Sequence, residues 1–321
     1  MFIRNAWYVA ATSAECGSER PLARTILSER VVLYRTPQGQ AVALEDRCAH
    51  RLAPLSKGDI EDGGLRCRYH GMKFAPSGKC IEIPGQERIP TVMCVRSFPL
   101  VERHGFLWIW VGAPERADPD LIVDCHWNQA PGWPTASGYI HYRANYLLIA
   151  DNLLDFSHLT YVHRTTLTVS ELPGVRPEIV PFERGVRIYR QVLNCQPSPL
   201  HAMAGKLTAR VDYWNRQAWW LPSIFENWAG SVPTGGEGAP HERRGGGDFR
   251  HFSLLPPETE RSTHYFFIHP TSFPHDDHGL IDRIGEGLHT AFGEDRVIIE
   301  AQQQVMDDSP GLHPKGAALD A

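Results

Sequence analysis

The chain has 321 residues, and 42% of them are hydrophobic, which is enough for one large or two ordinary domains with real cores and excludes general disorder. Its 32 Lys and Arg against 37 Asp and Glu give a net charge of -5 without any dense basic block, so nucleic acid is not an expected partner. No apolar stretch is long enough to cross a membrane, and the first residues are too polar for a signal sequence. We therefore expect a cytoplasmic protein without membrane attachment.

The first third of the sequence predicts a small all-β unit. Short β-type runs alternate there with Gly, Pro and Asp, and similar runs recur later in the chain. These runs are 31–34, 41–44 and 106–110, followed by 186–189 and 264–268. The segment 112–119 has two prolines and little apolar content, which is typical of a domain boundary. With the break near residue 117, the expected domains are 1–117 and 118–321.

The second domain is expected to be mixed α+β. Residues 143–165 show helical spacing without Gly or Pro, and residues 295–306 form a second helical stretch. In the latter, Val297, Ile298 and Ala301 would share the apolar face. A Gly-rich tract, 233–248, has the composition of a mobile surface loop or of a linker without function.

Four side chains with metal-binding chemistry stand in two short groups. Cys48 and His50 form the first group and, after sixteen further residues, Cys67 and His70 form the second. This spacing predicts either a structural zinc site or an electron-carrying [2Fe-2S] centre with both Cys on one iron and both His on the other. Zinc motifs usually pair Cys with Cys, so the mixed groups favour the two-iron centre. The other cysteines are expected to be small buried hydrophobic residues: Cys16, Cys80, Cys94, Cys125 and Cys195.

A second set of candidate ligands lies in the first predicted helix. Asp151, Asp155 and His158 share one face, and Asn152 lies beside them. His163 comes five residues after His158, so both could bind one metal only if the helix loosens or ends between them, for example by a bulge at 159–162. Two His and one carboxylate form the usual open site of non-haem Fe(II) oxygenases. Alone this signal is weak, but an electron-carrying centre upstream would supply what oxygen activation needs.

These motifs together resemble those of Rieske non-haem iron oxygenase α-subunits, especially the O-demethylase branch that includes vanillate and dicamba monooxygenases. The resemblance covers nearly the whole chain and rests on residues 5–10, 48–56, 67–71, 151–155, 158, 161–163 and 294–295. It implies a Rieske [2Fe-2S] domain followed by a helix-grip, START-like catalytic domain with an antiparallel sheet. It also implies that the family's C-terminal segment continues beyond residue 321.

The resemblance also implies roles for individual residues. Cys48 and Cys67 would hold one cluster iron, and His50 and His70 the other. The mononuclear Fe(II) would be held by His158, His163 and Asp295, with Glu294 as the fallback ligand. By the residues alone, Asp295 is one acid among many near a helix start.

Two further residues receive roles from the resemblance. Asp155 resembles the carboxylate that links a cluster His of one subunit to a metal His of the next, which implies a head-to-tail homo-oligomer, normally a trimer. Asn152 is similar to the family's Asn beside the iron; without the resemblance, it would be read as an amide bonded to the helix backbone.

The implied activity is an O2-dependent monooxygenation of a methoxy or methyl(ene) C–H bond on a small aromatic substrate, which we expect to be carboxylated. Electrons would come from NAD(P)H through a separate flavin reductase or ferredoxin. Ring hydroxylation is the alternative within the same chemistry, and an electron-transfer or small-molecule-binding protein is the remoter one. The pocket should be apolar with few polar groups; its candidate residues are Trp219, Trp220, Ile224, Phe225, Asn227, Trp228 and Phe267.

One departure from the family concerns the substrate anchor. Related demethylases often carry a His at the position that aligns with Ser253 here. His251 lies two residues earlier and would point to the same face of a strand. We therefore expect His251, with Ser253 beside it, as a candidate for anchoring a substrate carboxylate.

Overall fold

The computed structural model describes residues 1–163, 175–243, 246–273, 279–312 and 314–315. Two compact units make up the chain: Met1–Asp124 with Pro256–Glu260, and Cys125–Leu255 with Arg261–Ala321. The break expected near residue 117 lies among short helical turns just before this division. Residues 256–260 rejoin the first unit because Leu27 N–H and Ser28 N–H donate to the carbonyls of Pro257 and Glu258.

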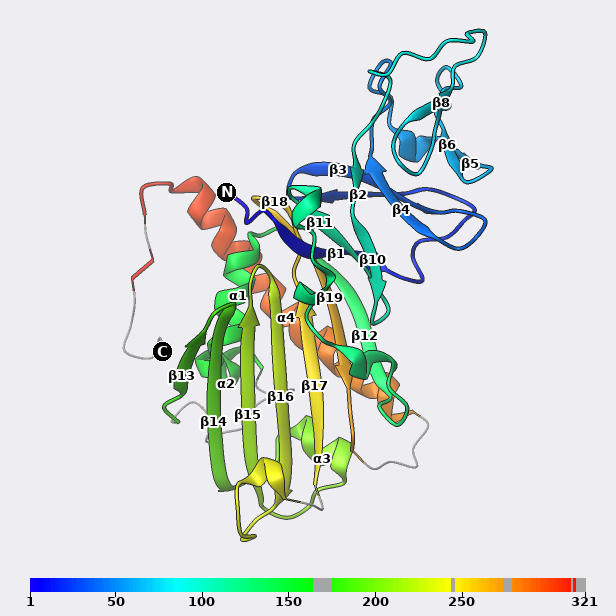
Figure 1. Cartoon of the computed structure of the whole chain (residues 1–321). Helices are drawn as coiled ribbons and strands as arrows, with labels where there is room; N and C mark the ends of the chain where they lie inside the picture. Colours follow the sequence, from blue (N-terminus) through cyan, green and yellow to red (C-terminus); the bar gives the residue numbers. More distant parts are fainter. Residues whose placement is uncertain (164–174, 244–245, 274–278, 313, 316–321) are drawn as a thin grey trace. The chain divides into compact units, whose positions relative to one another are not determined.

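The first unit is built from three small sheets (Figure 1). Their strand orders are β1-β11-β10, β2-β3-β4-β9 and β5-β6-β7-β8. The strands of these sheets are β1 (Ala6–Thr12), β2 (Leu22–Ile26), β3 (Glu29–Arg35), β4 (Ala41–Glu45), β5 (Asp59–Glu61), β6 (Gly64–Arg66), β7 (Lys73–Phe74), β8 (Cys80–Glu82), β9 (Ser97–Phe98), β10 (Leu100–Arg103) and β11 (Phe106–Val111). The short strand β18 (Pro257–Thr259) belongs to this unit but lies outside the three sheets. Short 3-10 turns are η1 (Leu55–Lys57), η2 (Pro114–Arg116) and η3 (Pro119–Leu121). The predicted all-β unit is confirmed.

Strand β3 separates two hydrophobic cores. Val31 and Leu33 pack into one core, whereas Val32 and Tyr34 pack into the other. Because successive side chains point to opposite faces of a strand, burial on both faces explains why this run is hydrophobic without alternation. The second core also contains the side chains of Cys48 and Cys67.

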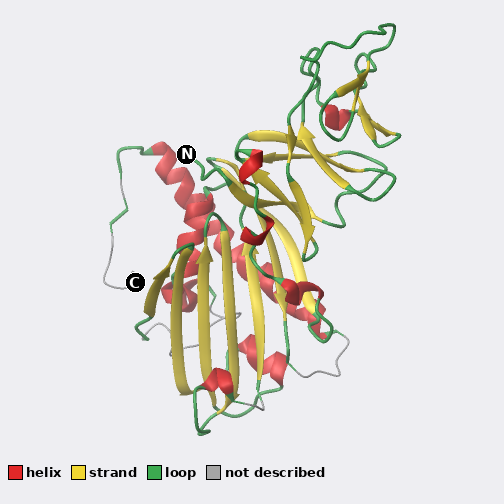
Figure 2. Ribbon diagram, viewed as in Figure 1, coloured by secondary structure: helices red, strands yellow, loops and turns green. Residues whose placement is uncertain are grey.

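The second unit contains one large antiparallel sheet with the order β12-β19-β17-β16-β15-β14-β13. Its strands are β12 (Thr135–Tyr142), β13 (Glu178–Phe182), β14 (Gly185–Cys195), β15 (Val211–Trp220), β16 (Ile224–Pro233), β17 (Gly247–Leu254) and β19 (Ser262–Pro270). The helices are α1 (Tyr146–Leu154), α2 (Leu159–Val162), α3 (Pro199–Gly205) and α4 (Leu280–Asp308), and the 3-10 turns are η4 (His126–Gln129), η5 (Phe156–His158) and η7 (Pro240–Glu242). Figure 2 shows α4 running across one face of this sheet, where it contacts β12, α1 and α3. This is the antiparallel sheet with few helices that the α+β prediction described.

The helix predicted over 143–165 is shorter and broken. Asn145 caps α1 by accepting the Leu147 N–H at 2.9 Å, and the chain leaves helical conformation at Asp155, whose φ and ψ are -97° and 106°. It resumes as η5 and α2 and ends before His163. The expected bulge at 159–162 was wrong, because these residues form the regular helix α2, but the helix does end between His158 and His163, as binding of one metal by both requires. The last two residues of the predicted helix lie outside the described residues.

Helix α4 begins fifteen residues before the predicted start at Asp295. Gly285, Gly287 and Gly293 made this segment look non-helical, since each Gly costs about 1 kcal/mol relative to Ala. Burial of the face that includes Ile284 and Phe292 offsets that cost. The predicted face was also wrong, because Val297, Ile298 and Ala301 are exposed.

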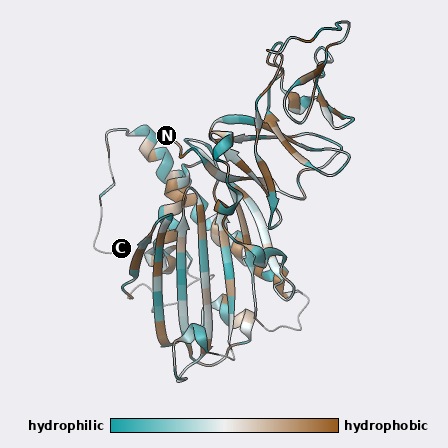
Figure 3. Cartoon of the chain, in the orientation of Figure 1, coloured by the Kyte–Doolittle hydropathy of each residue, from teal (hydrophilic) through white to brown (hydrophobic). Residues whose placement is uncertain are grey.

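Figure 3 shows hydrophobic and hydrophilic residues mixed along the strands of the large sheet. Strands β15 and β19 are buried along almost their whole length, on both faces. Among the described residues, no helix combines the length and the apolar composition that crossing a membrane requires.

The Gly-rich tract is fastened to the sheet over its described part. Arg243 donates to Asp212 Oδ2 at 2.6 Å, and both side chains are largely buried. Burial alone would raise the pKa of Asp212, but hydrogen bonds from Arg243, the Asn194 N–H and Thr234 lower it overall. This part of the tract is therefore not the free linker that its composition favours.

Candidate metal centres

The two Cys–His groups lie on loops with the same backbone pattern. The Cys48 N–H donates to the Ala53 carbonyl, and the Leu52 N–H donates back to the Cys48 carbonyl. The Cys67 N–H donates to the Met72 carbonyl, and the Gly71 N–H donates back to the Cys67 carbonyl. The fourth residue after each Cys is left-handed, with φ of 58° at Leu52 and 72° at Gly71.

These loops present buried sulfur and exposed imidazole. Cys48 and Cys67 are each 2% exposed and belong to the same buried core, whereas the rings of His50 and His70 are exposed with centroids 4.6 Å apart. Burial, together with the neighbouring Cys67 thiol, raises the pKa of Cys48 to about 11. Two thiolates so close together would need a cation between them, so the donor set fits a metal centre.

A single zinc ion fits this quartet poorly. The ligands of a tetrahedral zinc lie within about 4 Å of one another because each stands about 2.0–2.3 Å from the metal. In the described part of the chain, only one group of three such donors lies within 4.8 Å of one another, and it is in the second unit. The wider quartet suits two irons, with the thiols on the buried one and the imidazoles on the exposed one.

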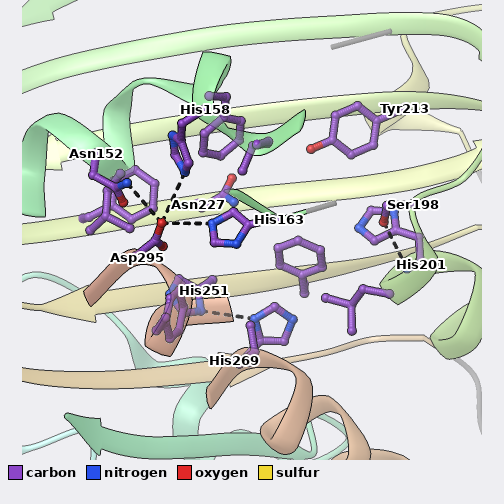
Figure 4. Close-up of a pocket in the computed structure, with 18 residues that line it drawn as sticks. Asn152, His158, His163, Ser198, His201, Tyr213, Asn227, His251, His269 and Asp295 are labelled. Atoms are coloured by element: carbon purple, nitrogen blue, oxygen red, sulfur yellow. Dashed lines mark hydrogen bonds and ion pairs between the residues drawn. The ribbon is translucent and has the colours of Figure 1, made fainter. Parts of the chain in front are cut away.

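In the second unit, three side chains gather around one carboxylate oxygen (Figure 4). Asp295 Oδ1 lies 3.0 Å from His163 Nε2 and 3.6 Å from His158 Nε2. It also accepts a hydrogen bond from Asn152 Nδ2 at 3.1 Å. His158, His163 and Asp295 form the group of three donors mentioned above.

The opposite ring nitrogens fix the tautomers of both imidazoles. His158 Nδ1 donates to the Asp155 carbonyl at 2.5 Å, and His163 Nδ1 donates to Glu294 Oε2 at 2.8 Å. Because both partners are acceptors, each Nδ1 carries a hydrogen, and each Nε2, which faces Asp295, is the nitrogen left to bind a metal once it carries no proton. The structure thus places Asp295 at the candidate metal position and Glu294 behind His163.

Electrostatics favour a cation at this position. Burial lowers the pKa of His158, an effect only partly opposed by Asp295. Burial acts in the same direction on His163, but its contacts with Asp295 and Glu294 outweigh burial and raise its pKa. The proton that Asp295 attracts to His163 would be replaced when a metal binds.

Hydrogen bonds join helix α4 to residues 142–145, which directly precede the helix α1 and the two histidines. The Arg143 N–H donates to Glu300 Oε1 and the Asn145 N–H donates to Gln303 Oε1, both at 2.9 Å. Tyr142 O–H donates to the Phe292 carbonyl at 2.9 Å. These bonds align residues that are about 150 positions apart in sequence.

The three donors lie at the wall of an apolar pocket. Its lining combines aliphatic and aromatic side chains with polar ones, and among the described residues that line it none is Lys or Arg. The apolar lining residues are Leu153, Phe156, Leu159, Leu200, Phe225, Phe249, Leu288 and Phe292, and the polar ones are Asn152, His158, His163, Ser198, His201, Tyr213, Asn227, His251, His269 and Asp295.

The expected pocket residues are found in several places. Phe225, Asn227 and His251 line the pocket, and Ser253 lies behind His251, at 2.9 Å from its Nε2. Trp228 follows Asn227 on β16 and therefore faces the other side of the sheet, where its Nε1 donates to Asp248 and Arg250 lies 3.6 Å above its ring. The remaining candidates do not line the pocket: Trp219, Trp220, Ile224 and Phe267.

Sequence analysis missed two pocket histidines, His201 and His269. Strand alternation was a usable signal for His269, since it shares a face of β19 with the buried Tyr265 and Phe267. Among the five cysteines expected to be buried, four are buried, whereas Cys94 is exposed, so that prediction was wrong for Cys94.

Comparisons with known proteins identify the family of the chain. The Rieske [2Fe-2S] domain model matches residues 6–99, and the model of the vanillate O-demethylase oxygenase C-terminal domain matches residues 142–320. The iron-sulfur subunit of the toluene-4-sulfonate monooxygenase system of Comamonas testosteroni is 47% identical, over 100% of this chain and 94% of that protein.

Two further matches concern dicamba oxygenases. The oxygenase component of dicamba O-demethylase from Stenotrophomonas maltophilia is 38% identical over 99% of this chain and 94% of that protein. The crystal structure of dicamba monooxygenase with non-heme iron and dicamba superposes with a TM-score of 0.83 at 34% identity, covering 99% of this chain and 93% of that one. The chain therefore belongs to the vanillate O-demethylase family of Rieske oxygenases and is an oxygenase subunit.

Proposed function

We propose that the chain is the oxygenase component of a monooxygenase that hydroxylates a methyl or methoxy C–H bond on a small aromatic substrate. The observation that carries the proposal is the convergence of His158 Nε2, His163 Nε2 and Asp295 Oδ1 at the wall of an apolar pocket. In the proposal these three residues hold a mononuclear Fe(II), and Cys48, His50, Cys67 and His70 hold the [2Fe-2S] cluster. When bound, the mononuclear iron would supply oxygen activation with electrons delivered through the cluster.

The protein's own contribution is to position groups and exclude water. The Asp155 carbonyl and Glu294 carboxylate keep the Nε2 lone pairs of the two histidines directed inward. Asn152 holds the Asp295 oxygen that both imidazoles face. Leu153, Phe156 and the rest of the apolar wall give an aromatic ring a water-poor place beside that group.

The substrate class follows from the pocket and the relatives. Relatives are named for toluene-4-sulfonate and dicamba, an aromatic methyl and an aromatic methoxy compound. Overall, one substrate C–H bond and the O–O bond break, a C–OH bond forms, and two electrons and two protons reduce the second oxygen atom to water. A hydroxylated methoxy group would then break down to formaldehyde and a phenol, whereas a methyl group would leave an alcohol.

Partners complete the proposal. The two electrons would come from NAD(P)H through a separate flavin reductase or ferredoxin. In a head-to-tail trimer, the Asp155 carboxylate would accept a hydrogen bond from a cluster histidine of the neighbouring subunit. This role suits its position at the break between α1 and η5, where it already accepts from Ser157 N–H and O–H at 2.8 Å and its own carbonyl holds His158.

Metal analysis tests the proposal. We would purify the wild type and His158→Ala without oxygen and quantify iron, zinc and acid-labile sulfide, with EPR spectra of the reduced protein. About three Fe and two sulfides per chain, with loss of one Fe in the variant and an unchanged cluster signal, would support it. Zinc without sulfide, or two Fe that the variant does not change, would refute it.

Product analysis with 18O2 tests the reaction itself. Toluene-4-sulfonate, a methoxybenzoate and an unsubstituted benzoate would be supplied with a reductase and NADH. The proposal predicts one labelled oxygen atom in the product of a methyl substrate. Labelled oxygen on the ring of the unsubstituted compound would instead identify a ring hydroxylase.

A further inference from the structure

Three further histidines of the pocket are almost fully buried. His201, His251 and His269 are 2%, 4% and 3% exposed, and Figure 4 shows His201 at the opposite side of the pocket from Asn152 and Asp295. Burial lowers the pKa of His201 and His251 to about 3 and lowers that of His269 well below its usual value. Each ring is therefore neutral near pH 7 and carries a single N–H, whose position depends on its hydrogen-bond partners.

A chain of hydrogen bonds fixes that position for His269. Tyr265 O–H has one partner among the described residues, Ser253 Oγ at 2.7 Å, and the tyrosine is fully buried. Because a buried unpaired donor is costly, Tyr265 donates to Ser253. Ser253 must then donate to its remaining partner, His251 Nε2 at 2.9 Å.

The hydrogen bond between His251 and His269 then fixes which nitrogen of His269 carries the hydrogen. With its Nε2 accepting, His251 has its hydrogen on Nδ1 and donates to His269 Nδ1 at 3.1 Å. His269 therefore carries its own hydrogen on Nε2. Both nitrogens of His251 are used within this chain, so His251 does not itself anchor a substrate, in contrast to the expectation from sequence.

The same reasoning applies to His201. Ser231 is fully buried, and its hydroxyl has one partner among the described residues, His201 Nδ1 at 2.6 Å. Ser231 therefore donates to Nδ1, which leaves the hydrogen of His201 on Nε2. Ser198 Oγ accepts the His201 backbone N–H at 3.2 Å, and its own hydrogen has no acceptor within the described part of the chain.

These donors belong to one side of the pocket. The rings of His201 and His269 lie against the same phenylalanine, Phe249, with centroid distances of 5.1 and 4.3 Å. Both rings and Ser198 line the pocket, and neither imidazole Nε2 has a partner among the described residues. A sulfonate or carboxylate, which has several acceptor oxygens on one atom, would satisfy these donors at once.

We propose that Ser198, His201 and His269 form an oxyanion subsite that binds the sulfonate or carboxylate of an aromatic anion. Tyr265, Ser253 and His251 are positioning residues that keep the N–H of His269 directed at it. Hydrogen bonds to an anion are stronger than those to a neutral acceptor, so neutral donors suffice for selection. The inference rests on the proposed function, because the substrate ring would lie between this subsite and the candidate iron ligands.

Binding measurements on the cluster-containing, oxidised holoenzyme test this subsite without relying on turnover. Calorimetry would compare two anions, toluene-4-sulfonate and 4-methylbenzoate, with the neutral 4-methylbenzamide. We expect both anions to bind at least about tenfold more tightly than the amide. Equal affinities, or a preference for the amide, would overturn the proposal, and a response to only one anion would restrict the subsite to that head group.

Variants locate the selectivity. His269→Phe and His201→Phe should each remove most of the anion preference, and His269→Gln should keep it because its amide retains a donor. Ser253→Ala, which removes the hydrogen bond that fixes the His251 tautomer, should give a smaller loss of preference, and Ser253→Thr should keep it. The exposed His141→Phe is the matched control. If the two Phe variants bind anions and amide with an unchanged ratio while retaining their iron and sulfide, the subsite assignment is wrong.

The experiments can refute the subsite and the proposed reaction independently of one another. Anion selectivity without 18O incorporation would support the subsite and refute the proposed monooxygenation. Hydroxylation of the neutral amide as readily as of the anions, with equal affinities, would refute the subsite and leave the monooxygenase intact.

Discussion

The two candidate metal centres are built in different ways. In the first unit, each Cys and its His lie on one short loop, and that loop is closed by its own backbone hydrogen bonds. In the second unit, two imidazoles follow a break after α1, and the carboxylate comes from α4, more than 130 residues later. The first centre therefore depends on local backbone conformation, whereas the second depends on how a long helix packs. Substitutions should affect the two centres by different routes.

The largest effect is expected from the shared carboxylate. Asp295→Ala removes the oxygen that both Nε2 atoms face, so hydroxylation should fall to background and one Fe per chain should be lost. The cluster EPR signal should stay, because no cluster candidate lies in that unit. Iron analysis and product formation measure both effects, with Asp282→Ala on the same helix as the control. Loss of the cluster signal in Asp295→Ala would show that the two centres are not independent.

Packing of α4 is the next target. Phe292 is 5% exposed and packs against Tyr265 and Phe267, each at a ring distance of 5.2 Å. Phe292→Ala should lower the free energy of unfolding by about 3–5 kcal/mol because it leaves a cavity in this core. Denaturant unfolding followed by tryptophan fluorescence would measure it. A change below about 1 kcal/mol would mean that the helix does not depend on this contact.

A substitution of Glu294 tests how much its hydrogen bond with His163 contributes to iron binding. Glu294→Gln replaces a carboxylate acceptor of His163 Nδ1 with an amide, and the expected loss in iron affinity is about 10–100-fold. Iron retention against a chelator measures this affinity, and Glu286→Gln, exposed on the same helix, serves as control. Iron binding equal to that of the control would argue that packing alone orients His163.

The smallest effects concern the two left-handed loop positions. Gly71→Ala would strain a backbone with φ of 72° and bring its Cβ to 2.9 Å from Pro84 Cγ, so a loss of about 1–2 kcal/mol is expected. Leu52→Gly places a permissive residue at φ of 58°, so the cluster should be retained. The temperature at which the cluster absorbance is lost compares the variants. Equal destabilisation by both would contradict the backbone argument.

The same contrast explains what could be predicted from sequence. Both Cys–His groups and the β-type runs were readable because their signals lie within a few neighbouring residues. The break at Asp155 was not, since the segment contains no Gly or Pro; Asp155 instead starts a new turn by accepting the Ser157 N–H. The true start of α4 was hidden by glycines whose cost is offset by packing. The partnership of His163 with Glu294 and the polarity of the Tyr265–Ser253–His251–His269 chain required three-dimensional contacts between distant strands and helices.

Helix α4 also sets a distance. It contributes Asp295 to the candidate iron site and Leu288 to the pocket wall, seven residues earlier on the same helix. At 1.5 Å per residue, these positions are about 10.5 Å apart along the axis. A rigid helix keeps this spacing fixed, so α4 sets the distance between the candidate iron site and the part of the pocket wall formed by Leu288. A substitution at Leu288 would therefore change the length of substrate that the pocket accepts without moving the Asp295 carboxylate.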